Sequence, residues 1–474
     1  MPSMLARTRN RLPTAIRTVY NPIGFDPIEI LPDHLRRYSD HARYFLHVLY
    51  SQRAFKDVKG EYVPLKAAYL RRFFPSNEVY RQVREALLAS GTIVCDGIYR
   101  QADCPTWRNS DERSRGGKCF GYKLGPRWED VRHERTTLMA RPLIQSIAKV
   151  DLRRQSEIVT LPHRHIWRCL QDITINLDAA MMELDDLMVN ATPEEIDGYA
   201  GQRMLCDGIR GKDLFWHICP FGRVYNNLTG IKKSLRRHLR ANNSSLVACD
   251  VTNSQPLLVG LLCRRLLERS SIHSLTNSLH SSQFDHYELD QDLLDRISLP
   301  FPQKQEEERG GEERNSLYDV VFTESSQLIS MDLLRYINLC EEGKLYDELM
   351  ALEDNQNDRD KFKKQIFTQV FYGQNFYESK LTRLFAEEFP TVWTSIQAIK
   401  KEDYKRLSHH MLRLESEIVI NRAVRRCALE GIWVVTIHDC LVTVPEQAER
   451  VREIMVEAFG AVGIKPTIKV MVFD

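Results

Sequence analysis

A chain of 474 residues is long enough to hold two or three domains with cores of their own. Hydrophobic residues at 43% and charged residues at 27% are typical of a globular protein, and no apolar run is long enough to span a bilayer. The net charge of +2 excludes a strongly basic surface, so any affinity for nucleic acid must come from local patches. The eleven cysteines show neither a CxxC pair nor the spacing of a zinc site, which predicts free thiols in a reducing compartment. Because no apolar run is long enough to span a bilayer, we expect no membrane partner.

The first 27 residues are predicted to be a basic arm. Residues 1–20 contain several arginines and no acidic residue, which suits either an organelle transit peptide or an arm that touches phosphates. Pro13 and Pro22 argue against a long helix there.

Residues 28–130 are predicted to form a winged-helix-like domain. Helical patterns, the last capped by Ser76 and ended by Gly91, precede two short strands, TIVCDGIYR and KCFGYKLG. Helices followed by a two-stranded wing are the order of a winged helix. Its basic residues either contact phosphates or are solvated charges on a protein-docking wing. They are Lys66, Arg71, Arg72, Arg81, Arg84, Arg113, Arg115 and Lys118.

The middle of the chain is predicted to be helical. Residues 131–220 show helical spacing of apolar residues, interrupted at Pro142, Pro162 and Pro193. Residues 298–316, SLPFPQKQEEERGGEERNS, combine prolines, a charge run and a Gly pair, which predicts a solvated insertion without chemistry.

Two aspartates give the strongest chemical signal. Asp250 ends the apolar run Leu246–Cys249, and Asp439 follows His438 in the middle of a second run, IWVVTIHDCLVTVP. A buried carboxylate is costly unless a cation neutralises it. A single such aspartate is more often a cap or turn residue, but two matching sites with Lys and Arg between them suit two divalent metals and a polyphosphate substrate.

The sequence around these aspartates resembles family A nucleic-acid polymerases and the related single-subunit phage-type RNA polymerases. Three blocks occur in the family's order: Asp250 with Ser254-Gln255 resembles motif A, Lys364 with Tyr372-Gly373 resembles motif B, and His438-Asp439 resembles motif C. FGRVYNNLTGIKKSLRRHL is similar to the Gly-Arg and Asn-Leu segment that precedes motif A. The resemblance covers about half the chain, from Phe221 to Asp474.

The resemblance implies an α+β fold with a right-hand polymerase core. Palm and fingers would occupy residues 221–474, and the helical region 131–220 stands where family members carry the thumb. The implied activity is a template-dependent DNA polymerase, and the chain before Phe221 is too short for a proofreading exonuclease. Three alternatives stay open: a primase or RNA polymerase, a template-independent terminal transferase, and a non-catalytic nucleic-acid-binding protein with a relic core.

The implied partners are a primer-template, of DNA or RNA, and nucleoside triphosphates. We expect a cytoplasmic protein of bacterial, phage or plasmid context, with organelle import not excluded and the oligomeric state open. Asp250 and Asp439 would hold two Mg²⁺ ions, for which Mn²⁺ is an alternative. The resemblance makes Lys364 catalytic. Candidate nucleotide-binding residues are Tyr372, Lys361, Arg359 and Gln255, and candidate nucleic-acid-binding residues are Arg223, Arg236, Arg240 and His438.

Two basic segments are predicted to be helices. Lys361, Lys364, Thr368 and Tyr372 fall on one stripe of the segment that resembles motif B. IKKSLRRHLR reads as a compact basic helix in which Lys232, Arg236 and Arg240 recur every four residues. In both segments the alternative is an ordinary solvated face.

The sequence departs from the family at three positions. Cys440 stands where many family members have a Glu after the motif C Asp, which removes one possible metal ligand. Asp360 stands at the family's Arg position, so Arg359 and Lys361 are the neighbouring candidates. The Glu that excludes the ribose 2′-hydroxyl is expected two residues after Gln255, where Leu257 stands. The sequence therefore leaves the choice of sugar open, although we favour deoxynucleotides.

Overall fold

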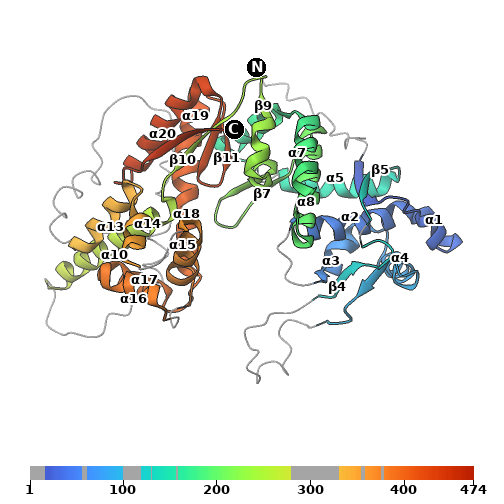
Figure 1. Cartoon of the computed structure of the whole chain (residues 1–474), viewed down its shortest axis with the longest axis horizontal. Helices are drawn as coiled ribbons and strands as arrows, with labels where there is room; N and C mark the ends of the chain where they lie inside the picture. The colour runs from blue at the N-terminus through green and yellow to red at the C-terminus, as the bar shows by residue number, and fades with distance from the viewer. Residues whose placement is uncertain are drawn as a thin grey trace, which may run out of the picture. The chain divides into compact units, whose positions relative to one another are not determined.

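The computed structural model describes residues 17–55, 61–99, 119–129, 131–155, 158–189, 191–278, 330–353, 358–374 and 378–473. Within them the fold is α+β, mostly helical with small antiparallel sheets (Figure 1). The chain divides into two compact units, the first made of Met1–Glu157 and Asp178–Asp207, the second of Ile158–Leu177 and Gly208–Asp474. Among the described helices, none has the length and apolar character needed to cross a membrane. The predicted insertion 298–316 lies outside the described residues.

Unit 1 contains a three-stranded antiparallel sheet and the helices that pack on it. Its elements are β1 (Arg17–Pro22), α1 (Pro27–Ile30), η1 (Asp33–Tyr38), α2 (Ser39–Phe55), β2 (Val63–Pro64), α3 (Ala67–Leu70), η2 (Arg71–Phe73), α4 (Asn77–Ala89), β3 (Ile93–Cys95), β4 (Gly121–Leu124), β5 (His133–Leu138), α5 (Arg141–Gln155), α7 (Leu177–Val189) and α8 (Pro193–Arg210).

The sheet of unit 1 has the strand order β2-β4-β3, and α2 and α4 pack against it. The predicted sequence of helix, then two strands, is present as α4, β3 and β4, with Ser76 accepting a hydrogen bond from the Val79 N–H to cap α4. Gly91, at φ 67°, follows the helix in the left-handed region that favours glycine. The third strand, β2, was not predicted because only two residues form it.

The prediction of helix throughout 131–220 is corrected at three places, and the last of them is β7 (Trp216–Ile218), which pairs with the neighbouring β8 (Val224–Asn226). β5 pairs with β1, from Arg17 opposite Leu138 to Pro22 opposite His133, so the predicted basic arm is part of a sheet from Arg17 onward. β6 (Ile173–Ile175) separates α6 (Leu161–Asp172) from α7 and pairs with β9 (Leu239–Ala241). β5 and β6 are short and pair with distant segments, so local periodicity could not reveal them. The residues of this region are shared between the two units.

Unit 2 contains the larger sheet and a helical layer. Besides α6, β6 and β9, its elements are β7 (Trp216–Ile218), β8 (Val224–Asn226), α9 (Asn227–Gly230), η4 (Lys233–His238), β10 (Val247–Val251), α10 (Ser254–Ser278), α13 (Met331–Glu341), α14 (Leu345–Leu352), α15 (Arg359–Gln365), η6 (Ile366–Phe371), α16 (Lys380–Glu388), α17 (Pro390–Lys400), α18 (Arg406–Ser416), η7 (Glu417–Val424), α19 (Arg425–Glu430), β11 (Val435–Ile437), β12 (Cys440–Thr443), η8 (Pro445–Gln447), α20 (Ala448–Gly460) and β13 (Ile468–Val472).

The sheet of unit 2 is antiparallel, with the strand order β11-β12-β10-β13. Helix α20 packs on one of its faces, and the Cys249 thiol of β10 lies 3.5 Å from the Ala448 carbonyl oxygen. Because side chains alternate along a strand, Asp250 points to the opposite face from Cys249. The covering helix thus leaves Asp250 on the open face of the sheet.

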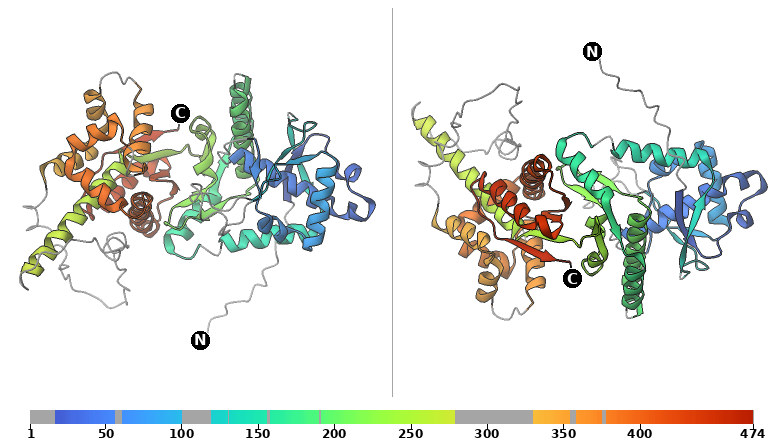
Figure 2. Two further views of the ribbon diagram at one scale, coloured as in Figure 1. Left: turned by 90° about the horizontal axis from the view of Figure 1, so that it is seen from below. Right: turned by 90° about the horizontal axis from the view of Figure 1, so that it is seen from above.

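The helical layer is organised around α10, which begins three residues after β10. Figure 2 shows α10 as one long helix, and it packs against α13, α17 and α18. The Tyr336 hydroxyl of α13 donates a hydrogen bond to the Pro256 carbonyl in the first turn of α10. These contacts fix the start of α10 beside the end of β10, and therefore the position of Gln255 relative to Asp250.

Candidate active site

Asp250 and Asp439 lie at the same end of two neighbouring strands. Asp250 is the fourth residue of β10, and β10 pairs with β12 so that Cys249 lies opposite Leu441. Asp439 was predicted within a strand, but it lies in the two-residue turn between β11 and β12, where Ile437 pairs with Cys440. Burial and the negative charge of Asp439 together raise the pKa of Asp250 to about 6. The structure thus brings the two carboxylates into electrostatic contact.

Three cationic side chains act on Asp250 in the opposite direction. Lys363 of α15, and Lys233 and Arg236 at η4, each lower its pKa, but they do not outweigh burial and Asp439. Arg236 is half-buried, and burial lowers its own pKa although the charge of Asp250 opposes this. The site is therefore negative at its centre with cations around it, which suits a metal ion and a phosphate.

Backbone strain borders both aspartates. Asn253 follows β10 at φ 55°, and His438 precedes Asp439 at φ 57°, in the left-handed region that non-glycine residues adopt at a cost. Within the described part of the chain, Asn253 Nδ2 and His438 Nδ1 are buried and have no hydrogen-bond partner. Strained residues with unsatisfied polar atoms are concentrated at functional sites.

A buried ion pair lies beside Asp439, and the sequence had identified only one of its members. Arg223, in the turn between β7 and β8, donates from Nε to Glu415 Oε1 at 2.6 Å and from Nη2 to Glu415 Oε2. Glu415 is 1% exposed on α18. Burial and the charge of Asp439 raise its pKa to about 7, against the opposing effect of Arg223. This pair fixes the Arg223 guanidinium at the site.

Gly222 allows that turn to lie against α18. Its φ of 87° favours glycine, and a Cβ atom there would lie 3.0 Å from the Ser416 Cβ. The family-like Gly-Arg dipeptide thus has a local structural reason: Gly222 provides the close approach, and Arg223 uses it to reach Glu415.

Tyr372 and Gln255 meet in the same region. The Tyr372 hydroxyl donates a hydrogen bond to Gln255 Oε1. Burial raises the Tyr372 pKa to about 12, and the charges of Arg223, Glu415 and Asp439 also act on it. Leu257, where a sugar-excluding Glu was expected, is fully buried in the core. Gln255, not residue 257, is therefore the α10 side chain that contacts Tyr372.

The predicted stripe assumed a uniform α-helix up to Tyr372, but the helix is irregular before that residue. After α15, η6 is a π-helix, and the Tyr372 N–H bonds to the Phe367 carbonyl five residues earlier. Lys400 of α17, which the sequence did not reveal, is 2% exposed and donates from Nζ to the carbonyls of Val370 at 2.7 Å and Gly373 at 3.1 Å. Burial lowers its pKa to about 8. It secures the irregular end of this helix.

The remaining candidates on α15 face solvent or a surface partner. Lys361 and Lys364 are exposed, as is Lys363 between them. Arg359 donates from Nε to Asp347 Oδ1 at 2.7 Å and lies 5.6 Å from the centre of the Tyr346 ring. The lysine of α15 whose charge acts on Asp250 is Lys363, which had not been selected.

The predicted basic helix IKKSLRRHLR is a 3₁₀-helix followed by a strand. η4 ends at His238, and Arg240 lies on β9 opposite Thr174 of β6. Its Nη1 donates to the carbonyls of Arg237 at 2.5 Å and Leu239 at 2.7 Å. Strand pairing with β6 overrides the helical spacing, so Arg236 and Arg240 do not form one row.

His438 is held by an aromatic contact. Its ring lies edge-on to Tyr225, with 5.7 Å between centroids and 73° between planes. Burial and the charge of Arg223 lower its pKa, so the imidazole is neutral at pH 7. Cys440, the next residue but one, is buried, and burial with the nearby aspartates raises its thiol pKa well above the ordinary value. It offers no anionic ligand.

The donor set fits Mg²⁺ shared with a substrate. Among the residues that the structure describes, no group of three His, Cys, Asp or Glu side chains could hold a metal ion alone. Mg²⁺ commonly takes one or two carboxylates and completes its shell with phosphate oxygens and water. Asp250 and Asp439 meet that requirement, and a bound cation would offset both causes of the raised Asp250 pKa, which are burial first and the charge of Asp439 second.

The comparisons with known proteins give distant structural likeness only. No protein-family model matches the chain, and no curated protein matches it significantly. Among solved structures, the chain is similar to the POL domain of Pol1 from M. smegmatis, in complex with DNA primer-template and dNTP. The identity is 9%, the TM-score is 0.35, and the match covers 71% of this chain and 76% of that chain. A score this low describes a partial likeness of the backbone, so function has to be argued from this chain's own residues.

Proposed function

We propose that the chain is a nucleotidyltransferase that extends a nucleic-acid 3′-hydroxyl with nucleoside triphosphates, as a template-dependent DNA polymerase without proofreading. The observation that carries the proposal is the electrostatic coupling of Asp250 and Asp439 at the ends of neighbouring strands, with the charges of Lys363, Lys233 and Arg236 acting on Asp250. In this interpretation unit 2 supplies palm and fingers, and α2, α4 and the small sheet of unit 1 form a winged-helix-like nucleic-acid-binding domain.

Each site residue has a distinct task in this reaction. Asp250 and Asp439 would hold Mg²⁺ or Mn²⁺, which when bound activates the 3′-hydroxyl and stabilises the leaving pyrophosphate. Lys363 and Arg236 neutralise negative charge on the triphosphate. Their charges already act on Asp250, where the phosphates would lie. Arg223, held by Glu415, binds the primer strand near its end. Tyr372 presents its ring to the incoming nucleotide while Gln255 fixes its hydroxyl.

The proposal is tested by measuring incorporation of labelled dNTPs and NTPs with Mg²⁺, with and without primer and template. We expect dNTP incorporation that requires both primer and template. NTP incorporation would move the chain to the RNA-making class, and template-free addition would make it a terminal transferase. Binding of the primer-template without any incorporation, under Mg²⁺ or Mn²⁺, would instead support a non-catalytic nucleic-acid-binding protein with a relic core.

Removing the charge of Asp250 is expected to stabilise the metal-free protein. Its folded pKa of about 6 lies above the ordinary value of 3.8, so the folded state retains a proton that the unfolded state has released. Stability from this group is therefore lost as pH rises from about 4 to 6. Asp250→Asn should raise the free energy of unfolding by about 1–2 kcal/mol at pH 7 and hardly at all at pH 4. Urea unfolding in EDTA at the two pH values measures this, with Glu453→Gln, a surface carboxylate, as control.

The family resemblance and the geometry assign the triphosphate to different lysines of α15. The resemblance assigns the triphosphate to Lys364, whereas Lys363 is the lysine that acts on Asp250. We expect Lys363→Ala to lower kcat/KM for the nucleotide by about tenfold to a hundredfold, because it removes a cation beside the reacting phosphates. Steady-state kinetics of Lys361→Ala, Lys363→Ala and Lys364→Ala would decide. A loss confined to Lys364→Ala would reverse the assignment, and equal losses would indicate a diffuse basic surface.

Sugar choice is expected to depend on the Tyr372–Gln255 hydrogen bond. Packing against a hydroxyl gives discrimination on the order of a hundredfold. We therefore expect a modest preference for dGTP over GTP in kcat/KM, and a smaller one in Gln255→Ala, where the Tyr372 ring loses its fixed position. Measuring both substrates opposite the same template base tests this. A preference of many thousandfold that survives Gln255→Ala would place the gate elsewhere.

A further inference from the structure

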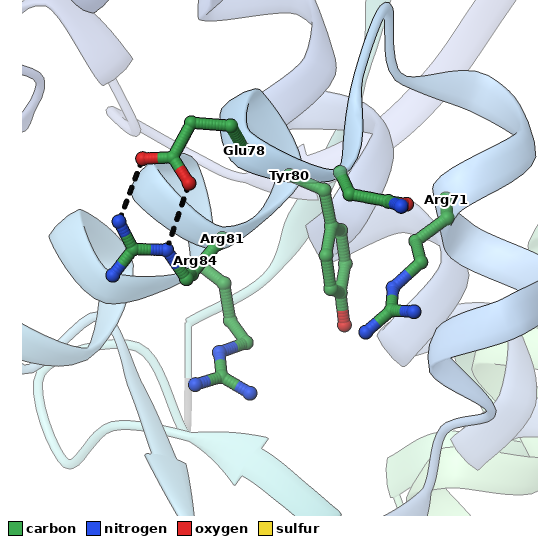
Figure 3. A pocket seen from close by; sticks show the side chains of 6 residues that line it. Arg71, Glu78, Tyr80, Arg81 and Arg84 are labelled. Carbon is green, nitrogen blue, oxygen red and sulfur yellow. Dashed lines mark hydrogen bonds and ion pairs between the residues drawn. The ribbon is translucent and has the colours of Figure 1, made fainter.

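A polar pocket lies in unit 1, between η2 and α4 (Figure 3). It encloses about 300 Å³, which is ample for a small anion with its water. Its lining is formed by Arg71, Asn77, Glu78, Tyr80, Arg81 and Arg84. Three guanidinium groups and one carboxylate therefore line the same pocket.

The Glu78 carboxylate pairs with only one of the three arginines that line the pocket, Arg81. Glu78 Oε1 accepts from Arg81 Nη2 at 2.6 Å, and Arg81 Nη1 also reaches Glu85 Oε1 at 3.2 Å. Figure 3 shows the Glu78–Arg81 pair to one side of Tyr80, with Arg71 on the other. The charge of Arg81 is thus matched within its own helix, and an incoming anion would meet the other two guanidiniums.

Arg71 and Arg84 carry charge that no carboxylate matches in the part of the chain that the structure describes. The Arg71 guanidinium lies 5.7 Å from the centre of the Tyr80 ring. Arg84 lies 5.9 Å from the centre of the Phe120 ring, and its Nη1 donates to the Tyr122 hydroxyl at 3.4 Å. Arg84 Nε is buried with no hydrogen-bond partner among the described residues. Aromatic contacts thus hold both side chains, while donors stay available.

The rest of the lining also favours an anion. Tyr80 is 3% exposed, and burial raises its pKa although Arg84, Arg71 and a hydrogen bond with Tyr122 oppose this, so its hydroxyl stays protonated and adds no negative charge to the pocket. The pocket lies at the N-terminal half of a 13-residue helix, whose dipole is positive at that end. The Asn77 amide adds a neutral donor.

We propose that Arg71 and Arg84, with Tyr80 between them, bind one phosphate group. Guanidinium forks match phosphate oxygens in pairs, and side chains already held by rings lose little entropy on binding. A phosphodiester of a nucleic-acid backbone and a free phosphate offer the same oxygens. We assign the site to the backbone phosphate, because the pocket opens beside the exposed Arg81 in the unit proposed above to bind nucleic acid, so this assignment rests on the proposed function.

The test uses the full chain without nucleotide or metal. Binding of a fluorescein-labelled 20-base-pair duplex is followed by anisotropy across a salt series, and binding of inorganic phosphate by calorimetry. Variants are Arg71→Gln, Arg84→Gln and the charge-keeping Arg84→Lys. Arg72→Gln, the exposed neighbour on η2 that does not line the pocket, is the matched control. Thermal unfolding reports whether each variant is folded.

Arg71→Gln and Arg84→Gln are expected to weaken duplex binding about tenfold and to reduce the slope of log K against log salt by about one. Arg84→Lys should retain part of the affinity, and Arg72→Gln all of it. Loss of inorganic phosphate binding with unchanged duplex affinity would overturn the backbone assignment in favour of a free phosphate. Glutamine variants that behave like Arg72→Gln with both probes would overturn the site itself.

Discussion

Asparagine at position 250 or 439 is expected to lower nucleotide incorporation by about a thousandfold or more, because each substitution removes a carboxylate that the two-metal reaction needs. Since both carboxylates lie together at the strand ends, the double variant should be little worse than either single variant. Single-turnover incorporation into a labelled primer measures the loss.

Glu453→Gln on α20 is the matched control, because that carboxylate pairs with Arg450 on the surface, away from the strand ends. It should retain full activity. Incorporation by the asparagine variants within tenfold of the unsubstituted chain would rule out the assignment of these residues.

Removing Glu415 is expected to have the largest effect on folding. Glu415→Ala leaves the Arg223 guanidinium without its partner in a buried place, which costs about 3–5 kcal/mol. Glu415→Gln keeps a hydrogen-bond acceptor and should cost less. Both variants weaken the hold on Arg223, Glu415→Ala more than Glu415→Gln, so in each the KM for primer-template should rise more than kcat falls.

Urea unfolding and steady-state kinetics together separate these effects. A double-mutant cycle with Arg223→Met isolates the coupling between the two side chains. We expect Glu415 to affect primer-template binding only by holding Arg223. Adding Glu415→Ala to Arg223→Met should therefore raise the KM for primer-template little further. An additive effect on KM would show that Glu415 contacts the primer-template or metal in its own right.

Part of the site could be predicted from sequence because it follows chain-local patterns. The apolar runs that carry Asp250 and Asp439 predict two strand segments, and the structure has a strand at the first and a hairpin at the second. The mixed α+β character of the fold was expected from the family resemblance, and the described residues have it. The turn at Asp439 was missed because His438, a non-glycine residue, occupies the positive φ that the turn requires.

Other parts depend on tertiary contacts that no local pattern encodes. Glu415 and Lys400 look like ordinary polar positions of amphipathic helices, and only packing shows that they are buried against Arg223 and the end of η6. The π-helical turns of η6 likewise depend on their surroundings. Strand β9 arises because β6 pairs with it, against the helical spacing of its own residues.

The most direct test of the central claim is a count of bound metal ions. Electron paramagnetic resonance of Mn²⁺, titrated into the chain with primer-template and a non-hydrolysable dNTP, reports how many ions the site takes up. We expect two tightly bound ions, with at least one lost in both Asp250→Asn and Asp439→Asn and both retained in Glu453→Gln. Equal Mn²⁺ binding by all four proteins would contradict a metal site at the ends of β10 and β11.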